Sequence, residues 1–152
     1  MTGFDSLVLT AFVATALYAG AEDWKRYEIP NSVSVVLIGL FLLLSFATSS
    51  IAFLPSFITA LCVLVIGFLF FVKGWLGAGD VKFLTAASLF AGPPLLPLFL
   101  YIIALSGGLL SVLFLVKSRL LSTTAGATVR LPYGAAIAVG CCWLFSQRMG
   151  LA

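Results

Sequence analysis

Two aspartates, Asp23 and Asp80, are the acidic residues of this chain whose positions suit chemistry. Each lies where a long apolar run meets a short polar segment, Gly77-Ala78-Gly79-Asp80 in one case and Asp23 to Asn31 in the other. Two carboxyl groups that share a site can hydrolyse a peptide bond. The charged one takes a proton from water, and the neutral one donates a proton to the scissile carbonyl or the leaving amine. Such a pair titrates as a coupled unit, because both groups cannot ionise cheaply at short range.

The composition excludes several other chemistries. The 152-residue chain has no histidine, which rules out His-dependent triads and zinc sites of the His-Glu-x-x-His kind. Its cysteines, Cys62, Cys141 and Cys142, lie inside apolar runs without a C-x-x-C pair and are expected to act as small hydrophobic residues. We therefore expect no metal and no cofactor. The net charge of +3 comes from basic residues scattered over short loops and does not indicate nucleic acid binding.

The elements that position the aspartates are expected to be membrane-spanning helices. The chain is 62% hydrophobic and 9% charged, which is typical of an integral membrane protein. The run from Phe4 to Ala21 is just long enough to cross a bilayer. The stretch from Ser32 to Val72 has no charge, and as one helix it would reach about 62 Å, twice the hydrocarbon thickness. We therefore expect a turn between Thr48 and Pro55.

The second half of the chain repeats this pattern. Val81 to Val116 would reach about 54 Å as one helix, and Gly92-Pro93-Pro94 supplies the break, because proline disfavours helix at the preceding residue. The segment from Asp80 to the break is short for a span, so either its start is recessed or the helix extends back through the Gly77–Gly79 segment. A last apolar run covers Tyr133 to Phe145. The sequence thus predicts an all-α integral membrane protein, a single domain over residues 1–152 with about six transmembrane helices.

The basic residues predict the orientation. Of the eight, all but Arg148 lie on the side reached after the first, third and fifth spans: Lys25, Arg26, Lys73, Lys82, Lys117, Arg119 and Arg130. Cytoplasmic loops carry an excess of Lys and Arg, so we expect this side to be cytoplasmic and both termini to lie on the non-cytoplasmic side. Asp23 and Asp80 would then share the cytoplasmic face.

Three short segments have structural explanations when each is taken alone. Gly77-Ala78-Gly79-Asp80 can be a glycine turn with an aspartate that caps a helix. Ile29-Pro30-Asn31 can be a solvated turn that leads into the next helix. Pro132-Tyr133-Gly134 can be a helix start with an interfacial aromatic residue.

Taken together, the three segments resemble those of the type IV prepilin peptidases, the GxGD class of membrane aspartyl proteases. The resemblance covers essentially the whole chain. It rests on Asp23 followed by Arg26 and Ile29-Pro30-Asn31, then Gly77-Ala78-Gly79-Asp80-Val81-Lys82, then Pro132-Tyr133-Gly134, in family order.

The resemblance implies a membrane endopeptidase that removes the basic leader from type IV prepilins and pseudopilins at the cytoplasmic face. Asp23 and Asp80 correspond to the catalytic pair. The remaining motif residues are candidates for positioning the substrate: Arg26, Pro30, Asn31, Gly77, Gly79, Lys82, Pro132, Tyr133 and Gly134. The expected location is the plasma (inner) membrane of a prokaryote, and the expected partners are prepilins, pseudopilins and the lipid bilayer.

The chain departs from the long form of that family. The long form has a cytoplasmic segment with paired cysteines between the first two spans, associated with N-methylation of the trimmed pilin, and this chain has only a short loop there. We therefore expect no methyltransferase activity. The short form resembles the peptidases of tight-adherence (Flp) pilus systems and, more distantly, archaeal preflagellin peptidases.

The roles of individual charged groups stay open at this point. Asp80 begins a helix, where the dipole favours an anion, and Asp23 follows a helix end, where it does not. The hypothesis is that Asp80 is the resting base and Asp23 the resting acid, although the nearby Lys25 and Arg26 oppose this. Lys82 either stabilises the Asp80 anion or holds substrate, or it is a topology lysine at the interface.

A different class of function remains as an alternative. Intramembrane acids also bind protons and cations, so the chain could be a small transporter or channel subunit. Transporters place such sites near the bilayer midplane, whereas Asp23 and Asp80 both adjoin cytoplasmic loops. Loss of cleavage in isosteric variants of the aspartates distinguishes the two classes.

Overall fold

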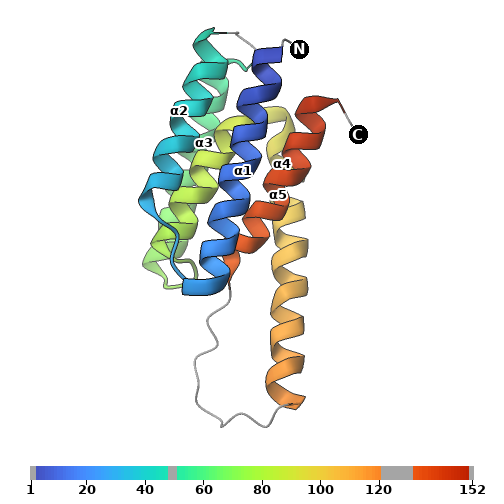
Figure 1. The fold of residues 1–152 in the computed structure, drawn as a ribbon. Coiled ribbons are helices and arrows are strands. Elements are labelled where there is room, and N and C mark those ends of the chain that lie inside the picture. The colour runs from blue at the N-terminus through green and yellow to red at the C-terminus, as the bar shows by residue number, and fades with distance from the viewer. Residues whose placement is uncertain (1–2, 48–50, 121–131, 151–152) are drawn as a thin grey trace.

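The computed structural model describes residues 3–47, 51–120 and 132–150, and the regular structure within these ranges is helical (Figure 1). It consists of five helices: α1 (Gly3–Arg26), α2 (Asn31–Ala47), α3 (Phe53–Val72), α4 (Ala78–Leu120) and α5 (Tyr133–Met149). The predicted all-α class is confirmed.

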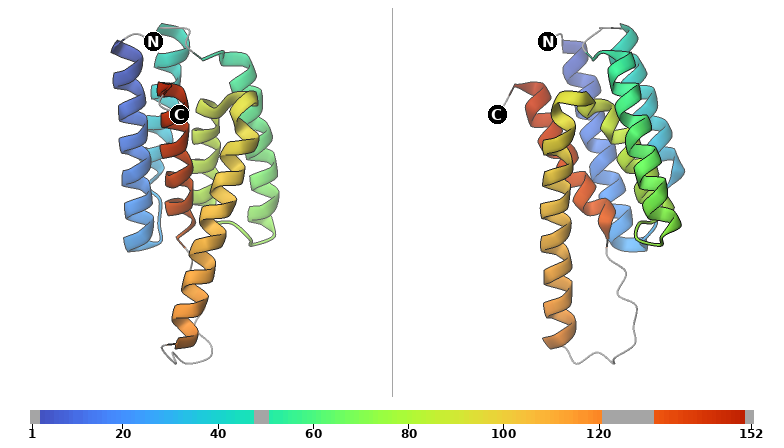
Figure 2. Two further views of the ribbon diagram at one scale, coloured as in Figure 1. Left: turned by 90° about the vertical axis from the view of Figure 1, so that its right-hand side faces the viewer. Right: turned by 180° about the vertical axis from the view of Figure 1, so that it is seen from behind.

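Three stretches of the described residues are long and apolar enough to cross a membrane: α1, α3 and residues 78–117 of α4. The shorter α2 is also apolar. The start of α1 and the end of α5 lie at one end of the bundle, whereas the end of α1 and the starts of α4 and α5 lie at the other (Figures 1 and 2). The segments that hold the two aspartates are therefore at the same end.

The helix α4 contains two of the predicted spans and is broken where expected. Gly92 has φ 60° and ψ −176°, outside the helical region, and Pro93, Pro94 and Pro97 follow it. Glycine adopts this positive φ without the steric cost that a side chain would add. The chain turns over here, so that the second limb of α4 runs back along the bundle and extends past it (Figure 2).

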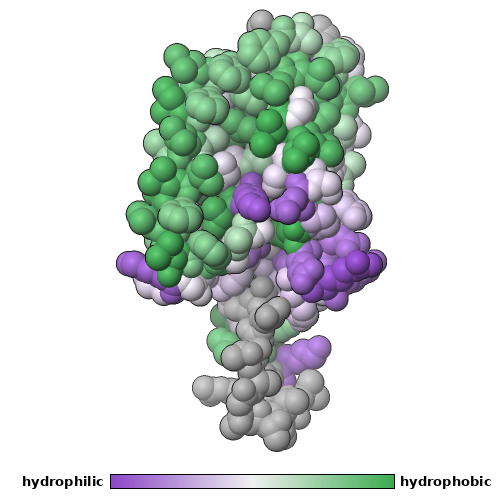
Figure 3. All heavy atoms as spheres, turned by 90° about the vertical axis from the view of Figure 1, so that its left-hand side faces the viewer, coloured by the Kyte–Doolittle hydropathy of each residue, from purple (hydrophilic) through white to green (hydrophobic). Residues whose placement is uncertain are grey.

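Aromatic packing holds the first limb of α4 in the centre of the bundle. Phe12 of α1 stacks on Phe90 with ring centroids 4.2 Å apart, and Phe41 of α2 meets Phe90 edge-on at 6.0 Å. All three side chains are fully buried. The outer surface is also apolar: Val35, Phe46 and other large hydrophobic residues are exposed. Figure 3 shows hydrophobic residues covering most of one face, with hydrophilic residues gathered toward the end where α1 stops. This distribution suits a lipid environment.

The end of α1 differs from the prediction. The helix was expected to stop at Ala21, but it continues to Arg26, so Asp23 lies in its last turn rather than in a loop. Glutamate, lysine and arginine form helix well, and Arg26 Nε pairs with Glu22 Oε2 at 3.2 Å across one turn. Tyr27, with φ 54°, ends the helix, and its N–H donates to the Asp23 carbonyl at 2.9 Å. The apolar run marked the membrane-spanning part of the helix but not its end.

Candidate active site

Asp23 is buried and bonded to the start of α5. Only 5% of its surface is exposed, and its Oδ2 accepts a hydrogen bond from the Gly134 N–H at 2.7 Å. Pro132, the residue before α5, offers no side-chain cap. The Asp23 carboxyl group therefore caps α5 from another helix, where unpaired amides and the helix dipole favour an acceptor.

The residue at position 134 has to be glycine for this contact to form. A Cβ atom there would lie 2.9 Å from Cβ and Oδ2 of Asp23 and 2.9 Å from Cδ1 of Ile29. Contacts this close are not tolerated, so any side chain would displace the carboxyl group or α5. The glycine of the Pro132-Tyr133-Gly134 segment thus has a direct structural link to Asp23.

Asp80 lies in the first turn of α4 and caps its own helix. Its Oδ2 accepts the Gly77 N–H at 3.3 Å, and the side chain is half-buried. A Cβ on Gly77 would lie 2.9 Å from that oxygen. The helix begins at Ala78, so it extends back through Ala78 and Gly79 but not Gly77. Asp80 was expected just before the helix as its N-cap, whereas it lies inside the first turn and bonds back to Gly77.

The two aspartates open onto one cavity of about 340 Å³ and interact electrostatically. The cavity is lined by residues from the end of α1, the start of α2 and the start of α4: Asp23, Tyr27, Glu28, Ile29, Asn31, Gly77, Ala78, Gly79, Asp80 and Lys82. Two carboxyl groups in one polar cavity, each bonded to a backbone amide, can act as an acid–base pair on a bound peptide. Within the described part of the chain, no cluster of three His, Cys, Asp or Glu side chains could hold a metal ion.

Ile29 holds the three motif segments together. It packs against Gly79, whose added Cβ would lie 3.3 Å from the Ile29 Cβ, and its Cδ1 lies against Gly134. Ile29 and the left-handed Tyr27 were not among the predicted site residues. Apart from the position of Ile29 inside the Ile29-Pro30-Asn31 segment, the sequence carried no signal for them.

Residues 10–112 match the model of the type IV leader peptidase family. The chain belongs to the type IV leader peptidase family. The match covers more than half of the chain and includes both Asp23 and Asp80, whereas Gly134 lies beyond it. No curated protein and no solved structure matches the chain. The resemblance seen in the sequence is confirmed at the level of the family.

The other predicted site residues divide into two groups, those that line the cavity and those that do not. Lys82 and Asn31 line the cavity, and Lys82 Nζ donates to Asn31 Oδ1 at 3.0 Å, so the lysine is bonded to α2 rather than to Asp80. Arg26 is paired with Glu22 and lies outside the cavity lining.

The proline and tyrosine positions also lie outside the cavity. Pro30 precedes α2, and its carbonyl accepts the Val33 N–H at 3.1 Å. Pro132 is fully buried before α5, and Tyr133 lines a separate apolar cavity beside the second limb of α4. These three residues do not line the aspartate cavity, whereas six predicted residues do: Asp23, Asn31, Gly77, Gly79, Asp80 and Lys82.

Proposed function

We propose that this leader peptidase is an aspartic endopeptidase in which Asp23 and Asp80 together activate the water that cleaves the leader from type IV prepilins and pseudopilins. The observation that carries the proposal is that the two carboxyl groups line one cavity. Residues from α1, α2 and α4 form that cavity. Glu28 also lines the cavity, and its charge complements a basic leader.

The chemistry requires one charged and one neutral carboxyl group. The anion takes a proton from water as the water oxygen attacks the scissile carbonyl carbon, and the neutral acid protonates the carbonyl oxygen. The C–N bond then breaks: the amine leaves with the proton first taken from water, and a hydroxyl of the tetrahedral intermediate returns a proton to the second carboxylate, which restores the resting pair. The products are the leader with a new carboxylate and the pilin with a new amino terminus.

We assign the resting negative charge to Asp23 and the proton to Asp80, the reverse of the hypothesis from the sequence. The amides of Gly134 and Ala135 both act on Asp23, and the bond from Gly134 is 2.7 Å long, against 3.3 Å for the bond from Gly77 to Asp80. Hydrogen bonds to a charged acceptor are shorter and roughly twice as strong as neutral ones. The sequence hypothesis considered only the end of α1 and not the start of α5.

Isotope-edited infrared spectroscopy tests this assignment. The wild-type protein should show the band of a protonated carboxyl group, and this band should disappear in Asp80→Asn. Persistence of this band in Asp80→Asn would assign the resting proton to Asp23 instead.

The proposed topology has six membrane crossings, with both limbs of α4 crossing and both termini on the non-cytoplasmic side. It is supported by the common end of the first and last helices in Figure 1 and by Lys25, Lys73 and Lys82 at the opposite end. We further propose that the protein resides in the inner membrane of a prokaryote and lacks methyltransferase activity. Only residues 27–30 separate α1 from α2, which leaves no room for the methylation segment of the long form.

The decisive experiment is co-expression with Flp-type and type IV prepilins, followed by detection of leader loss. Asp23→Asn and Asp80→Asn should each abolish cleavage. Asp5→Asn is the matched control, because Asp5 is also buried but lies in the first turn of α1, at the other end of that helix. Cleavage at the wild-type rate by either site variant would refute the catalytic pair. A wild-type protein that leaves every prepilin intact and moves a solute would favour the transporter alternative.

A further inference from the structure

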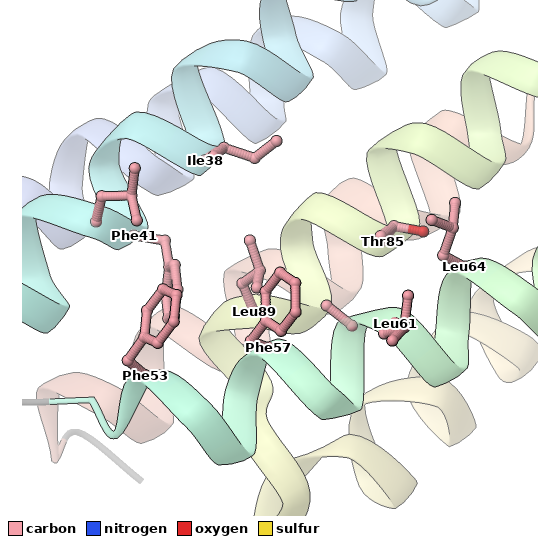
Figure 4. A pocket seen from close by; sticks show the side chains of 10 residues that line it. Ile38, Phe41, Phe53, Phe57, Leu61, Leu64, Thr85 and Leu89 are labelled. Carbon is pink, nitrogen blue, oxygen red and sulfur yellow. The ribbon is translucent and has the colours of Figure 1, made fainter.

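An apolar groove lies between α2 and α3, with the first limb of α4 as its floor (Figure 4). The helices α2 and α3 follow each other in sequence but make few contacts with one another, because each packs mainly on other helices. The resulting cavity of about 270 Å³ is lined by side chains such as Ile38, Phe41, Phe57, Leu61 and Leu89. Ile38 and Leu61 are exposed, so the groove opens on the outer surface.

The groove lies on the same helix faces as the aspartate cavity. On α4, Lys82 lines the cavity, while Thr85 and Leu89 line the groove, at spacings of three and seven residues that share one helix face. On α2, Asn31 lines the cavity and Ile38, two turns further on, lines the groove. The hydrogen bond between Lys82 and Asn31 therefore lies at the junction, and the groove begins about one helical turn beyond it.

One polar atom in this apolar groove has no partner. Thr85 Oγ1 is buried and makes no hydrogen bond within the described residues, and Figure 4 shows its side chain among the lining residues. Buried hydroxyl groups are normally satisfied. The hydroxyl is shut off from the groove, whose surface is apolar, so it does not select the occupant. Position favours a peptide segment, because the groove leads away from the aspartate cavity along α2 and α4, and a chain whose scissile bond lies at the aspartates would continue into it.

We propose that the groove receives the apolar helix that follows the scissile bond of the prepilin, a refinement that rests on the proposed function. On α3 the lining residues extend from Phe53 to Leu64, about 16 Å or three helical turns. The volume accommodates a row of side chains rather than a whole helix, so the substrate helix lies along the opening and inserts one ridge. Its leader end then reaches the Lys82–Asn31 junction and the two aspartates.

Photo-crosslinking tests the occupant directly. A benzophenone amino acid at position 61 should form an adduct with a co-expressed prepilin in an Asp80→Asn background, which retains uncleaved substrate. The control is position 66, because Ile66 is exposed on the other side of the same helix and does not line the groove. A prepilin adduct from position 66 but not from 61, or adducts from 61 with lipid only, would overturn the proposal.

Groove filling provides an independent measurement on active protein. Leu61→Trp should raise the KM for a full-length prepilin about tenfold, without changing cleavage of a soluble peptide that holds the leader and the scissile bond but no apolar helix. Ile66→Trp should change neither, and the amount of each variant in the membrane is measured. A wild-type KM for prepilin in Leu61→Trp would refute the proposed role of the groove and leave the proposed function standing. A wild-type protein that cleaves neither substrate would refute the proposed function and, with it, the groove.

Discussion

At each end of α5 a charged side chain bonds to backbone groups that a helix leaves unpaired, and the two side chains have opposite charges. At its start, the Gly134 amide donates to Asp23 of α1. At its last turn, Arg148 donates to carbonyls at the end of the first limb of α4, with Nε and Nη2 at 3.0 and 2.8 Å from the Phe90 oxygen and Nη2 at 3.3 Å from the Ala91 oxygen. A carboxyl group thus satisfies an amide that α5 leaves unpaired at its start, and a guanidinium group satisfies carbonyls that the first limb of α4 leaves unpaired at its end.

The surroundings of the two ends differ. Asp23 opens onto a cavity that holds a second carboxyl group. Arg148 instead lies near Gly92 at the break in α4, where a Cβ on Gly92 would be 3.1 Å from Ser56 Oγ. Capping therefore serves stability at both ends, and the Asp23 end also opens onto the cavity with the second carboxyl group. The comparison predicts that changes at the Asp23 end reduce activity and that changes at the Arg148 end reduce stability.

The largest effect is expected for Asp80→Asn. The amide side chain can still accept the Gly77 N–H, but it cannot transfer a proton, so prepilin cleavage should fall at least ~10³-fold with little change in thermal stability. Cleavage assays and thermal unfolding in detergent provide the measurements. A large loss of stability together with activity would show that the carboxyl group is mainly structural.

Gly134→Ala should lower both the stability of the protein and its cleavage activity. The added Cβ would contact Asp23 and Ile29 at 2.9 Å, which is expected to cost about 1–3 kcal/mol of stability and to displace the Asp23 carboxyl group. Cleavage should therefore fall further than the loss of folded protein explains. Gly39→Ala is the matched control, since nothing lies within 4 Å of the added atom in α2. Wild-type cleavage in Gly134→Ala would show that the start of α5 is not needed to hold Asp23 in its active position.

Arg148→Met should show the opposite pattern. It removes the hydrogen bonds to Phe90 and Ala91 and should lower the free energy of unfolding by about 1–3 kcal/mol, while cleavage per folded molecule stays at the wild-type level. Arg148→Lys should recover only part of the stability, because it lacks the planar fork. A loss of specific activity without a loss of stability would contradict the division between the two ends.

Arg26→Gln is expected to have the smallest effect. Although Arg26 belongs to the motif, its side chain is 74% exposed and pairs with Glu22 rather than with the cavity. Exposed pairs of this spacing contribute roughly 0.3–0.5 kcal/mol. Prepilin cleavage should stay within about twofold of wild type, as measured by initial rates. A larger drop would show that Arg26 contacts the substrate leader.

The sequence by itself determined which segments are helical, although not where α1 ends, and that the two aspartates lie at the same end of the bundle. Apolar runs, the Gly92-Pro93-Pro94 break and the charged loops depend on local backbone chemistry and on the cost of burying charge, so they can be read along the chain. The start of α5 at Tyr133 was correct for the same reason, whereas Asp80 lies in the first turn of α4 and not just before it.

The tertiary structure alone decided which distant groups the polar side chains bond to. Asp23 is bonded to an amide 111 residues away, Lys82 to a side chain 51 residues away, and Arg148 to a carbonyl 58 residues away. Each of these bonds depends on how neighbouring helices pack, which local propensity does not specify. The same packing leaves Arg26 outside the cavity and brings the start of α5 to Asp23, so the hydrogen bonds that Asp23 accepts depend on the assembled bundle.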